Sequence, residues 1–243
     1  MRPAGDFGLD SPAAPATWML SGAAALVGGV VLWFVAPLWS IPLFAWTALM
    51  FAGAAVYVHA SLRGKYAIWA DLLDKASLAD GERALDLGCG RGAVAICVAR
   101  RFPGADVTGI DLWRSVDQSG NSPDTARRNA ELNGVGDRVH FDTGDMLELP
   151  YPDQTFALVT ASVAIHNIST DEARRRAIRQ AVRVTAPGGK IIIADIYRRR
   201  VEAYAEELRQ AGCAVDGPTP AGWNGWFTGP WLATRTIVAA KPR

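Results

Sequence analysis

Charged side chains are absent from one long stretch near the start of this sequence. Of the 243 residues, the 52 from Ser11 to Leu62 include no Asp, Glu, Lys or Arg, whereas the rest carries charges at ordinary density. Such a stretch is too long for a single membrane span. The apolar excess of this chain is therefore gathered in one place, which predicts a unit separate from the remainder.

Cysteine and net charge are scarce as well. Cys89, Cys97 and Cys213 are odd in number and lack the spacing of metal ligands, a usage typical of a reducing compartment. No acidic cluster fit for magnesium and no His/Cys group fit for zinc is visible in the sequence, so no metal is expected. The formal net charge of +1 provides no field that would draw the protein to DNA or RNA, and we expect no nucleic-acid partner.

Two apolar segments make up the uncharged stretch. Ala16–Ala36 and Ile41–Leu62 are separated by a proline-containing turn at Pro37–Pro42. About 20 residues at a rise of roughly 1.5 Å each cross a hydrocarbon core about 30 Å thick. We predict a transmembrane helical hairpin that interacts with the lipid bilayer, and three units in all: a tail of residues 1–15, the hairpin of residues 16–62 and a domain of residues 63–243.

Basic residues flank the hairpin on one side only. Arg2 precedes the first segment, Arg63 and Lys65 follow the second, and the turn between the segments has no charge. Because cytoplasmic loops carry the excess of basic residues, both termini and the domain are expected in the cytoplasm. The predicted location is the inner (cytoplasmic) membrane, as a multi-pass protein.

Two alternatives remain open for the apolar stretch. The first segment could be a signal peptide, although the residues before it hold one Arg against two Asp and the second segment would still need a membrane or a core. Small residues recur at helical spacing, Ala25 with Gly29 and Ala48 with Ala52. They could bring the two helices together or pair two chains as a homodimer.

Beyond Arg63 the pattern changes to alternating helices and strands. Short apolar segments are separated by helices of 10–15 residues, which predicts an α/β fold with a doubly wound, mainly parallel sheet. In such sheets the ligand lies at the carboxyl ends of the strands. The helix predicted over Thr170–Thr185 is expected to stop at Pro187–Gly189. The expected strands are Arg83–Leu87, Asp106–Asp111, Val139–Asp142, Phe156–Ala161, Lys190–Ile196 and Arg235–Ala240.

A glycine-rich turn follows the first of these strands. Gly88-x-Gly90-x-x-Ala93 fits the dinucleotide fingerprint, and by itself it is weak evidence. Asp86, two residues before the first glycine, decides between ligands, because its carboxylate would repel a pyrophosphate dianion. It suits a ligand with a positive amino group, such as the methionine end of S-adenosylmethionine.

Two more acids follow the next two strands. Asp111 comes 23 residues after Gly88, where a carboxylate can accept hydrogen bonds from both ribose hydroxyls. Asp145 and the backbone N–H of Met146 can together read an adenine edge. Taken singly, Asp86 could be a helix cap and Asp145 an ordinary turn residue, but three acids at three successive strand ends are more specific than any one of them.

Four motifs in order resemble those of the class I S-adenosylmethionine-dependent methyltransferases, and in particular the small-molecule branch similar to quinone-ring methyltransferases. They are ALDLGCGRG, VTGIDLW, TGDMLELPYPDQTFALVTAS and RVTAPGGKIIIAD. The resemblance covers about Tyr66–Arg243 and implies a methyltransferase enzyme with a Rossmann-like, seven-stranded sheet whose last β-hairpin is only inferred. It also implies S-adenosyl-L-methionine as the cofactor.

The resemblance carries roles for individual residues. The glycine turn and Asp86 would hold the methionine part of the cofactor, and Asp111 would bind the ribose. Leu112 and the Asp145–Met146 pair would contact the adenine. The segment Trp113–Asp124 is longer and more polar than usual, so Asn121 or Ser119 could form an extra lid. The expected cofactor-binding residues are Asp86, Gly88, Cys89, Gly90, Gly92, Asp111, Leu112, Asn121, Asp145, Met146 and Ser162.

The methyl acceptor is less well defined by the sequence. Methyl transfer needs alignment of acceptor, methyl and sulfur, and a general base only when the acceptor arrives protonated. His166 is either that base or a structural histidine, and Asp195 could orient it or bind substrate. Arg198–Arg200 is interpreted as a solvated helix face or as a contact to anionic headgroups, and Gly222–Trp231 as core packing, a substrate wall or a membrane-dipping surface.

The function predicted from these patterns is that of a membrane-anchored methyltransferase. Its acceptor would be a small lipophilic molecule methylated at a phenolic oxygen, a ring carbon or an amine, because anchoring lets the site meet a bilayer-dissolved substrate. Two alternatives belong to other classes. One is a non-catalytic S-adenosylmethionine sensor or membrane scaffold, and the other is a nicotinamide-dependent oxidoreductase, against which Asp86 and Asp145 argue.

Overall fold

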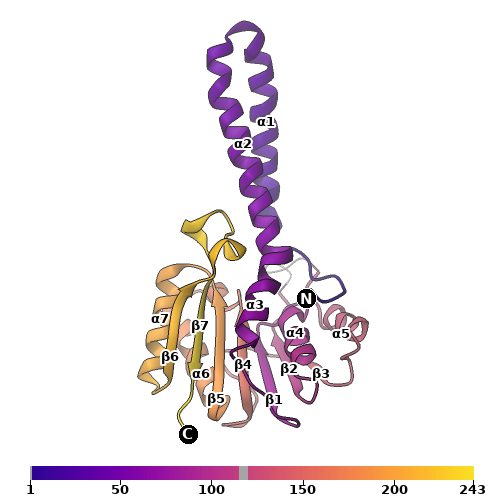
Figure 1. Ribbon diagram of the computed structural model, residues 1–243, viewed down its shortest axis with the longest axis vertical. Helices are drawn as coiled ribbons and strands as arrows, with labels where there is room; N and C mark the ends of the chain where they lie inside the picture. Colours follow the sequence, from indigo (N-terminus) through magenta and orange to yellow (C-terminus); the bar gives the residue numbers. More distant parts are fainter. Residues whose placement is uncertain (1, 115–119) are drawn as a thin grey trace.

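A computed structural model describes residues 2–114 and 120–243 of the chain. Figure 1 shows a long helical hairpin that projects from one end of an α/β domain. The hairpin consists of α1 (Ala13–Val35) and α2 (Pro37–His59), which pack along each other.

The turn of the hairpin is tighter than predicted. Only Ala36 separates the two helices, and Pro37 is the first residue of α2, a position that proline tolerates because its missing N–H has no helical partner there. Pro42 lies inside α2 and not in the turn. At its other end α2 runs on through a π-helical segment, Ala60–Gly64, into α3 (Lys65–Leu73). The hairpin was predicted to end at Leu62, but the helical backbone continues through this residue.

Close contact between α1 and α2 depends on two glycines. A Cβ atom on Gly29 would lie 2.9 Å from Phe44, and one on Gly22 would lie 3.0 Å from Phe51. The Thr47 hydroxyl also donates a hydrogen bond to the Gly22 carbonyl at 3.1 Å. Ala48 and Ala52, by contrast, are exposed, so this predicted pair of small residues does not form the contact within the hairpin.

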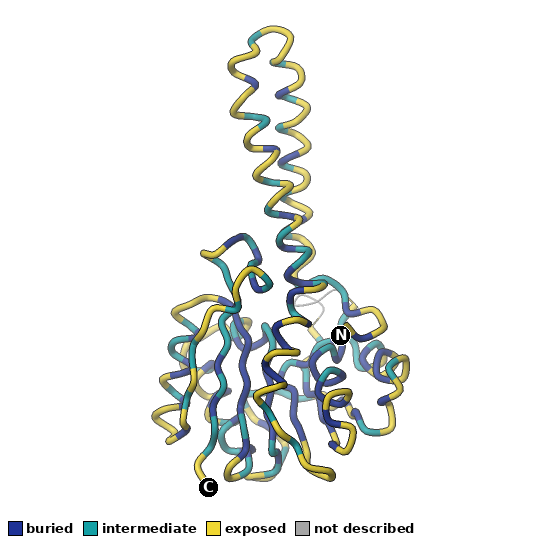
Figure 2. The backbone as a smooth tube through the Cα atoms, viewed as in Figure 1, coloured by how far each residue is buried: buried dark blue, intermediate teal, exposed yellow. Residues whose placement is uncertain are grey.

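Most other side chains of the hairpin are apolar and exposed, as the yellow tube in Figure 2 shows. Phe34 is 81% and Leu38 79% accessible. Both helices are long and apolar enough to cross a membrane, and most of their residues are not covered by the domain. This pattern differs from that of a core helix, which would be buried inside the protein.

The domain is built on a seven-stranded mixed sheet in the order β3-β2-β1-β4-β5-β7-β6. β1 to β5 are parallel to one another, and β7 is antiparallel to both of its neighbours. The doubly wound, mainly parallel sheet is confirmed. The strands are β1 (Arg83–Leu87), β2 (Asp106–Asp111), β3 (Val139–Thr143), β4 (Phe156–Ser162), β5 (Thr185–Asp195), β6 (Ala214–Pro220) and β7 (Arg235–Ala240).

Two layers of helices cover the sheet, each over its own apolar cluster. One layer holds α3, α4 (Ala93–Arg101) and α5 (Pro123–Leu132), and the other holds α6 (Asp171–Val184) and α7 (Arg198–Gln210). Side-chain caps start two of these helices: Ser122 accepts a hydrogen bond from the Thr125 N–H, and Thr170 accepts one from the Ala173 N–H.

Element ends differ from the prediction where glycine and proline occur. α6 stops at Val184 and β5 begins at Thr185, so Pro187–Gly189 lies within the irregular start of a strand and does not end the helix. β5 also ends at Asp195, one residue earlier than expected. β6, which had only been inferred, pairs with β7 across a shift in register.

The residues before the hairpin pack against the domain. Phe7 is 2% exposed and contacts Tyr66 edge-on, with ring centroids 6.1 Å apart. Asp6 forms an ion pair with Arg91 at 2.6 Å, and Asn129 hydrogen-bonds both the N–H and the carbonyl of Asp6. The N-terminal segment is thus part of the domain's core, and the hairpin is joined to the domain through both of its ends.

Candidate functional site

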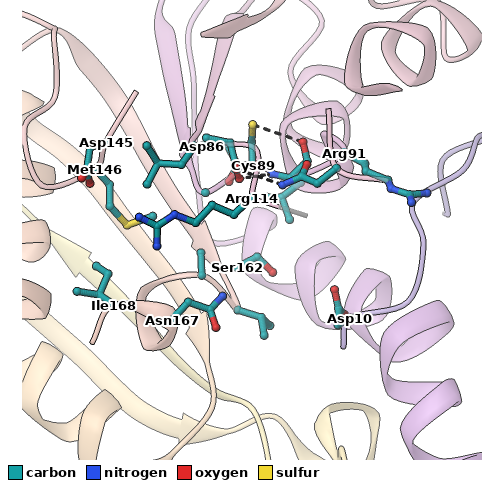
Figure 3. Close-up of a pocket in the computed structure, with 18 of the residues that line it drawn as sticks. Asp10, Asp86, Cys89, Arg91, Arg114, Asp145, Met146, Ser162, Asn167 and Ile168 are labelled. Atoms are coloured by element: carbon teal, nitrogen blue, oxygen red, sulfur yellow. Dashed lines mark hydrogen bonds between the residues drawn. The ribbon is translucent and has the colours of Figure 1, made fainter. Parts of the chain in front are cut away.

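A cavity of about 260 Å³ lies at the carboxyl ends of β1, β2 and β4 (Figure 3). We call it the strand-end cavity. Parallel strands bring their carboxyl ends to one edge, so residues far apart in sequence meet there. Its lining includes ten of the eleven residues predicted to bind cofactor: Asp86, Gly88, Cys89, Gly90, Asp111, Leu112, Asn121, Asp145, Met146 and Ser162.

The turn after β1 requires glycine at two positions. Gly88 has φ +63°, and a Cβ atom there would lie 2.5 Å from that of Ala164. Gly92, which does not line the cavity, has φ +81°, and its Cβ atom would lie 2.7 Å from Phe141. Both the left-handed backbone and the lack of space exclude larger side chains. The turn therefore places backbone directly against the cavity and ahead of α4.

Asp86 is the most deeply buried acid of the cavity, with 1% exposure. Its Oδ1 accepts a hydrogen bond from the Thr160 hydroxyl at 2.8 Å, and its Oδ2 accepts one from the Ala95 N–H at 3.1 Å. Burial raises the pKa of Asp86 to about 7, although these two hydrogen bonds act in the opposite direction. The helix-cap interpretation is partly right, since Ala95 lies in the first turn of α4, but Asp86 also lines the cavity.

Asp111 ties the glycine turn to the end of β2. One carboxylate oxygen accepts from the Gly90 N–H at 2.9 Å, and the other accepts from the Trp113 N–H and the Asn121 amide. The Oδ1 atom of Asn121 is buried and has no hydrogen-bond partner among residues 2–114 and 120–243. A buried acceptor without a donor is costly, so this atom suits a ligand hydroxyl. Ser119, the other lid residue predicted, lies outside the described residues.

Asp145 and Met146 form the third side of the strand-end cavity. Asp145 accepts a hydrogen bond from the Leu147 N–H at 2.9 Å, which holds the turn after β3. Leu112 is 42% exposed at the same edge. Ser162, on the far side, accepts a hydrogen bond from the Trp69 indole at 2.9 Å. These groups offer a polar edge and apolar contacts side by side.

Cys89 lines the cavity as a packing residue. Its thiol is buried, and burial together with the neighbouring Asp86 and Asp111 carboxylates raises its pKa well above the ordinary value. A thiol in such a setting is a poor nucleophile. The structure thus supports the interpretation of Cys89 as a small residue tolerated in the turn.

Several lining residues were not predicted. Lys65 and Asp10 form an ion pair at 3.0 Å that joins the start of α3 to the segment before α1. These two residues flank the uncharged stretch, and nothing in the sequence indicates that they pair. Arg114 reaches across the cavity toward Met146 (Figure 3). Its position directly after the VTGIDLW motif could have drawn attention to it, but the direction of its side chain could not be predicted.

A second cavity, of about 570 Å³, lies between the domain and the base of the hairpin. We call it the hairpin cavity. It adjoins the strand-end cavity, because both are lined by the same five residues. The shared residues are Asp10, Val163, Asn167, Ile168 and Ser169.

His166 lines the hairpin cavity and not the strand-end cavity. Its Nδ1 lies 2.6 Å from Oδ1 of Asp195, whose Oδ2 accepts from the His166 backbone N–H at 3.0 Å. Asp195 is 1% exposed at the end of β5 and lies behind the histidine. Because a carboxylate only accepts, Nδ1 is the donor of this bond, and Nε2 is left as a proton acceptor.

Comparison with known proteins agrees with this arrangement. A family model described as a methyltransferase domain matches residues 84–189, which contain all three strand-end acids. Within these residues the chain is similar to methyltransferase domains. The cofactor that the motifs implied is S-adenosylmethionine, and the match agrees with it.

Proteins similar to this chain are named as methyltransferases of small molecules. The chain is 37% identical to the 27-O-demethylrifamycin SV methyltransferase of Amycolatopsis mediterranei over 56% of its own length and 47% of the relative's. It is 29% identical to the ubiquinone/menaquinone biosynthesis C-methyltransferase UbiE of Cereibacter sphaeroides, over 54% of its length and 50% of the relative's. The chain therefore spans about half the length of these curated relatives.

A solved structure shares the fold of the domain. The geranyl diphosphate C-methyltransferase of Streptomyces coelicolor, in complex with Mg²⁺, geranyl diphosphate and S-adenosyl-L-homocysteine, superposes with a TM-score of 0.58 at 16% identity. The match covers 76% of this chain and 82% of that one. At this identity the likeness shows the fold alone.

Proposed function

We propose that the chain is a membrane-anchored methyltransferase that transfers a methyl group from S-adenosylmethionine to a small lipophilic acceptor at the cytoplasmic face of the membrane. The observation that carries the proposal is the adjacency of two cavities: one has the acids suited to the cofactor, and the other has a His–Asp pair and lies at the base of an exposed apolar hairpin. Acceptor and methyl donor would meet where the cavities join.

The strand-end cavity offers a partner for each polar part of the cofactor. Asp86 would hold the amino group, Asp111 and the unpartnered Oδ1 of Asn121 the ribose, and Asp145 with Met146 the adenine. When bound, S-adenosylmethionine supplies an activated methyl group on a sulfonium. The protein's own part is to orient the acceptor toward that group and exclude water.

His166 would act as the general base. With Nδ1 held by the buried Asp195, its Nε2 can take the proton from an acceptor hydroxyl or amine. Arg200 donates a hydrogen bond to the His166 carbonyl at 2.8 Å and fixes the same turn from α7. The alternative, a purely structural histidine, predicts that removing the ring lowers stability and leaves turnover in the surviving protein unchanged.

The hairpin would span the membrane, with both chain ends and the domain in the cytoplasm. Its exposed apolar surface supports this, as do aromatic residues at the distal turn, among them Trp39, and near the domain, Trp18. The segment Gly222–Leu232 stands beside the base of the hairpin (Figure 1), where Trp223 is 60% and Trp231 76% exposed. We assign these two indoles to the interface on the cytoplasmic side.

The decisive experiment is cofactor binding and turnover by the full chain in phospholipid nanodiscs. Isothermal titration is expected to show one S-adenosylmethionine per chain, and a membrane lipid extract is expected to yield S-adenosylhomocysteine. Asp86→Asn should abolish both, whereas Asp71→Asn, at an exposed site on α3, should change neither. Absence of binding at millimolar cofactor would contradict the proposal, and binding without turnover would favour a sensor.

A further inference from the structure

The hairpin does more than anchor the domain. We infer that α1 and α2 supply one wall of the acceptor site, and that the acceptor is an amphiphile: a ring with an acidic hydroxyl lies in the hairpin cavity while an apolar tail follows the hairpin into the bilayer. This inference rests on the proposed function and specifies the substrate class and the residues that select it.

Aromatic side chains from the hairpin and the domain meet at this wall. Trp18 of α1 packs edge-on against Tyr57 of α2, with ring centroids 5.7 Å apart, and Tyr57 packs edge-on against Phe227 at 5.1 Å. All three residues line the hairpin cavity. Gly53 of α2 also lies beside this indole, since a Cβ atom there would be 3.7 Å from Trp18, an ordinary van der Waals distance. The wall is therefore apolar and aromatic and is shared between two parts of the molecule.

Polar residues line the hairpin cavity as well. Asn167 and Ser169, which follow His166 in the chain, are shared with the strand-end cavity. A head group bound beside them can reach the methyl donor, while the rest of the molecule lies along the aromatic wall. The cavity thus offers both the polar and the apolar contacts that an amphiphile needs.

Charge within the cavity favours a hydroxyl over an ammonium group. Asp10 is paired with Lys65, and Asp195 is bonded to His166. Arg200 also lines the cavity, and no acidic side chain of residues 2–114 and 120–243 forms an ion pair with it. A half-buried cation in the site stabilises an oxyanion and repels a protonated amine. A phenolic or enolic hydroxyl, which His166 can deprotonate, fits these groups best.

The tail has a direct route to the membrane. Trp18 lies five residues into α1, about 8 Å from its start at the usual rise per residue. The next residues along α1, Met19 and Leu20, are 53% and 74% exposed. A chain leaving the cavity past Trp18 would therefore contact apolar helix surface and lipid without crossing water.

The test uses the full chain in nanodiscs of phosphatidylcholine and phosphatidylglycerol, saturated with S-adenosylhomocysteine. Isothermal titration compares two probes, 4-dodecylphenol and the tailless 4-methylphenol. Two variants alter the wall: Trp18→Ala removes it, and Ala14→Trp fills the cavity that Ala14 lines. Matched controls on the same helix are Trp33→Ala near the distal turn and Ala24→Trp at an exposed position.

We expect saturable binding of one 4-dodecylphenol per chain in the unmodified protein. Both wall variants should weaken it by about tenfold or more, and both controls should stay within about twofold. Because all samples contain the same lipid, partitioning of the probe into the bilayer cancels in the comparison. 4-Methylphenol should lose less affinity in Trp18→Ala than 4-dodecylphenol does.

Equal affinity of 4-dodecylphenol for wall variants and controls, or no saturable binding to the unmodified protein, would overturn the inference. Cofactor binding, measured first in each sample, separates this failure from that of the proposed function. If the unmodified chain binds S-adenosylmethionine but no alkylphenol, only the acceptor assignment is wrong. If Trp18→Ala misfolds and loses cofactor binding, the inference is judged on Ala14→Trp and on Trp18→Phe, which keeps an aromatic ring at this position.

Discussion

The strand-end cavity and the hairpin cavity adjoin each other, yet they are assembled in different ways. The first is built mainly from short motifs at the ends of consecutive strands, such as Asp86 and Asp111. The second combines α1, α2, the segments that follow β4 and β5 and the segment before β7, which are brought together only by packing. On the proposed function, the cofactor is bound by local sequence motifs, whereas the acceptor is selected by contacts between distant parts of the chain.

Removing the proposed base should have the largest effect on turnover. Cofactor binding in the strand-end cavity should not change. His166→Ala is expected to lower turnover with lipid extract by about 10²–10⁴-fold, because the acceptor proton loses its partner. Cofactor affinity, measured by titration, should stay unchanged. His140→Ala, at an exposed position on β3, is the control. Unchanged turnover in a folded His166→Ala protein would assign the histidine a structural role.

Forcing a side chain into the glycine turn should damage the strand-end cavity first. In Gly88→Ala a Cβ atom would have to fit a backbone with φ +63° and a neighbour at 2.5 Å. We expect the free energy of unfolding to fall by roughly 1–3 kcal/mol and cofactor binding to be lost. Gly81→Ala is a useful control, since its φ is also positive (+82°) but nothing lies near the added atom. Similar cofactor affinities in the two variants would show that the close approach is unimportant.

The protonation of Asp86 should make cofactor binding depend on pH. Its raised pKa of about 7 means that the carboxylate needed for the amino group becomes scarce in more acidic solution. The association constant should fall by about tenfold per pH unit below that value and level off above it. Titrations across this range in the full chain would measure the profile, and a flat profile would remove Asp86 from contact with the amino group.

The same pKa has the opposite consequence for the stability of the cofactor-free protein. An acid whose pKa is raised on folding, here from 3.8 to about 7, favours the folded state when protonated. Its contribution is fully present below the lower value and is lost as the pH rises through the higher one. Asp86→Asn should therefore remove this pH dependence and stabilise the cofactor-free protein in neutral solution, which thermal unfolding would detect. If one variant loses cofactor affinity and gains stability, the Asp86 carboxylate binds the cofactor and destabilises the cofactor-free fold.

The smallest effect is expected from the amide at the ribose side. If Asn121 binds the cofactor as proposed, Asn121→Ala removes one hydrogen bond to it, worth about 1 kcal/mol or about fivefold in affinity. Asn224→Ala makes the same change at the base of the hairpin, where the side chain meets His59 at 3.2 Å, and should leave cofactor affinity unchanged. An equal effect of both substitutions would mean that the two cavities are coupled more tightly than their separate construction suggests.

Much of the domain follows from local sequence pattern. Arg83–Leu87 and Asp106–Asp111 were predicted with their observed bounds, because a buried parallel strand is a continuous apolar run bounded by turn residues. Other ends shifted where the pattern was ambiguous. Pro187–Gly189 is typical of a helix end, but these residues belong to β5, which pairs with the neighbouring strand. Pro42 likewise reads as a turn residue and is held in α2.

The sequence by itself determined the apolar hairpin, through its missing charges, and the cofactor side of the domain, through acids placed at strand ends. The sequence left open whether Asp195 orients His166 or binds substrate, and the tertiary structure placed the two side chains 2.6 Å apart. The tertiary structure alone decided that Lys65 meets Asp10 and that Trp18 shares a wall with Phe227. The physical reason is the range of the contacts. Strand-end positions follow from short periodic patterns, whereas pairs separated by tens to hundreds of residues depend on how helices, strands and hairpin pack against one another.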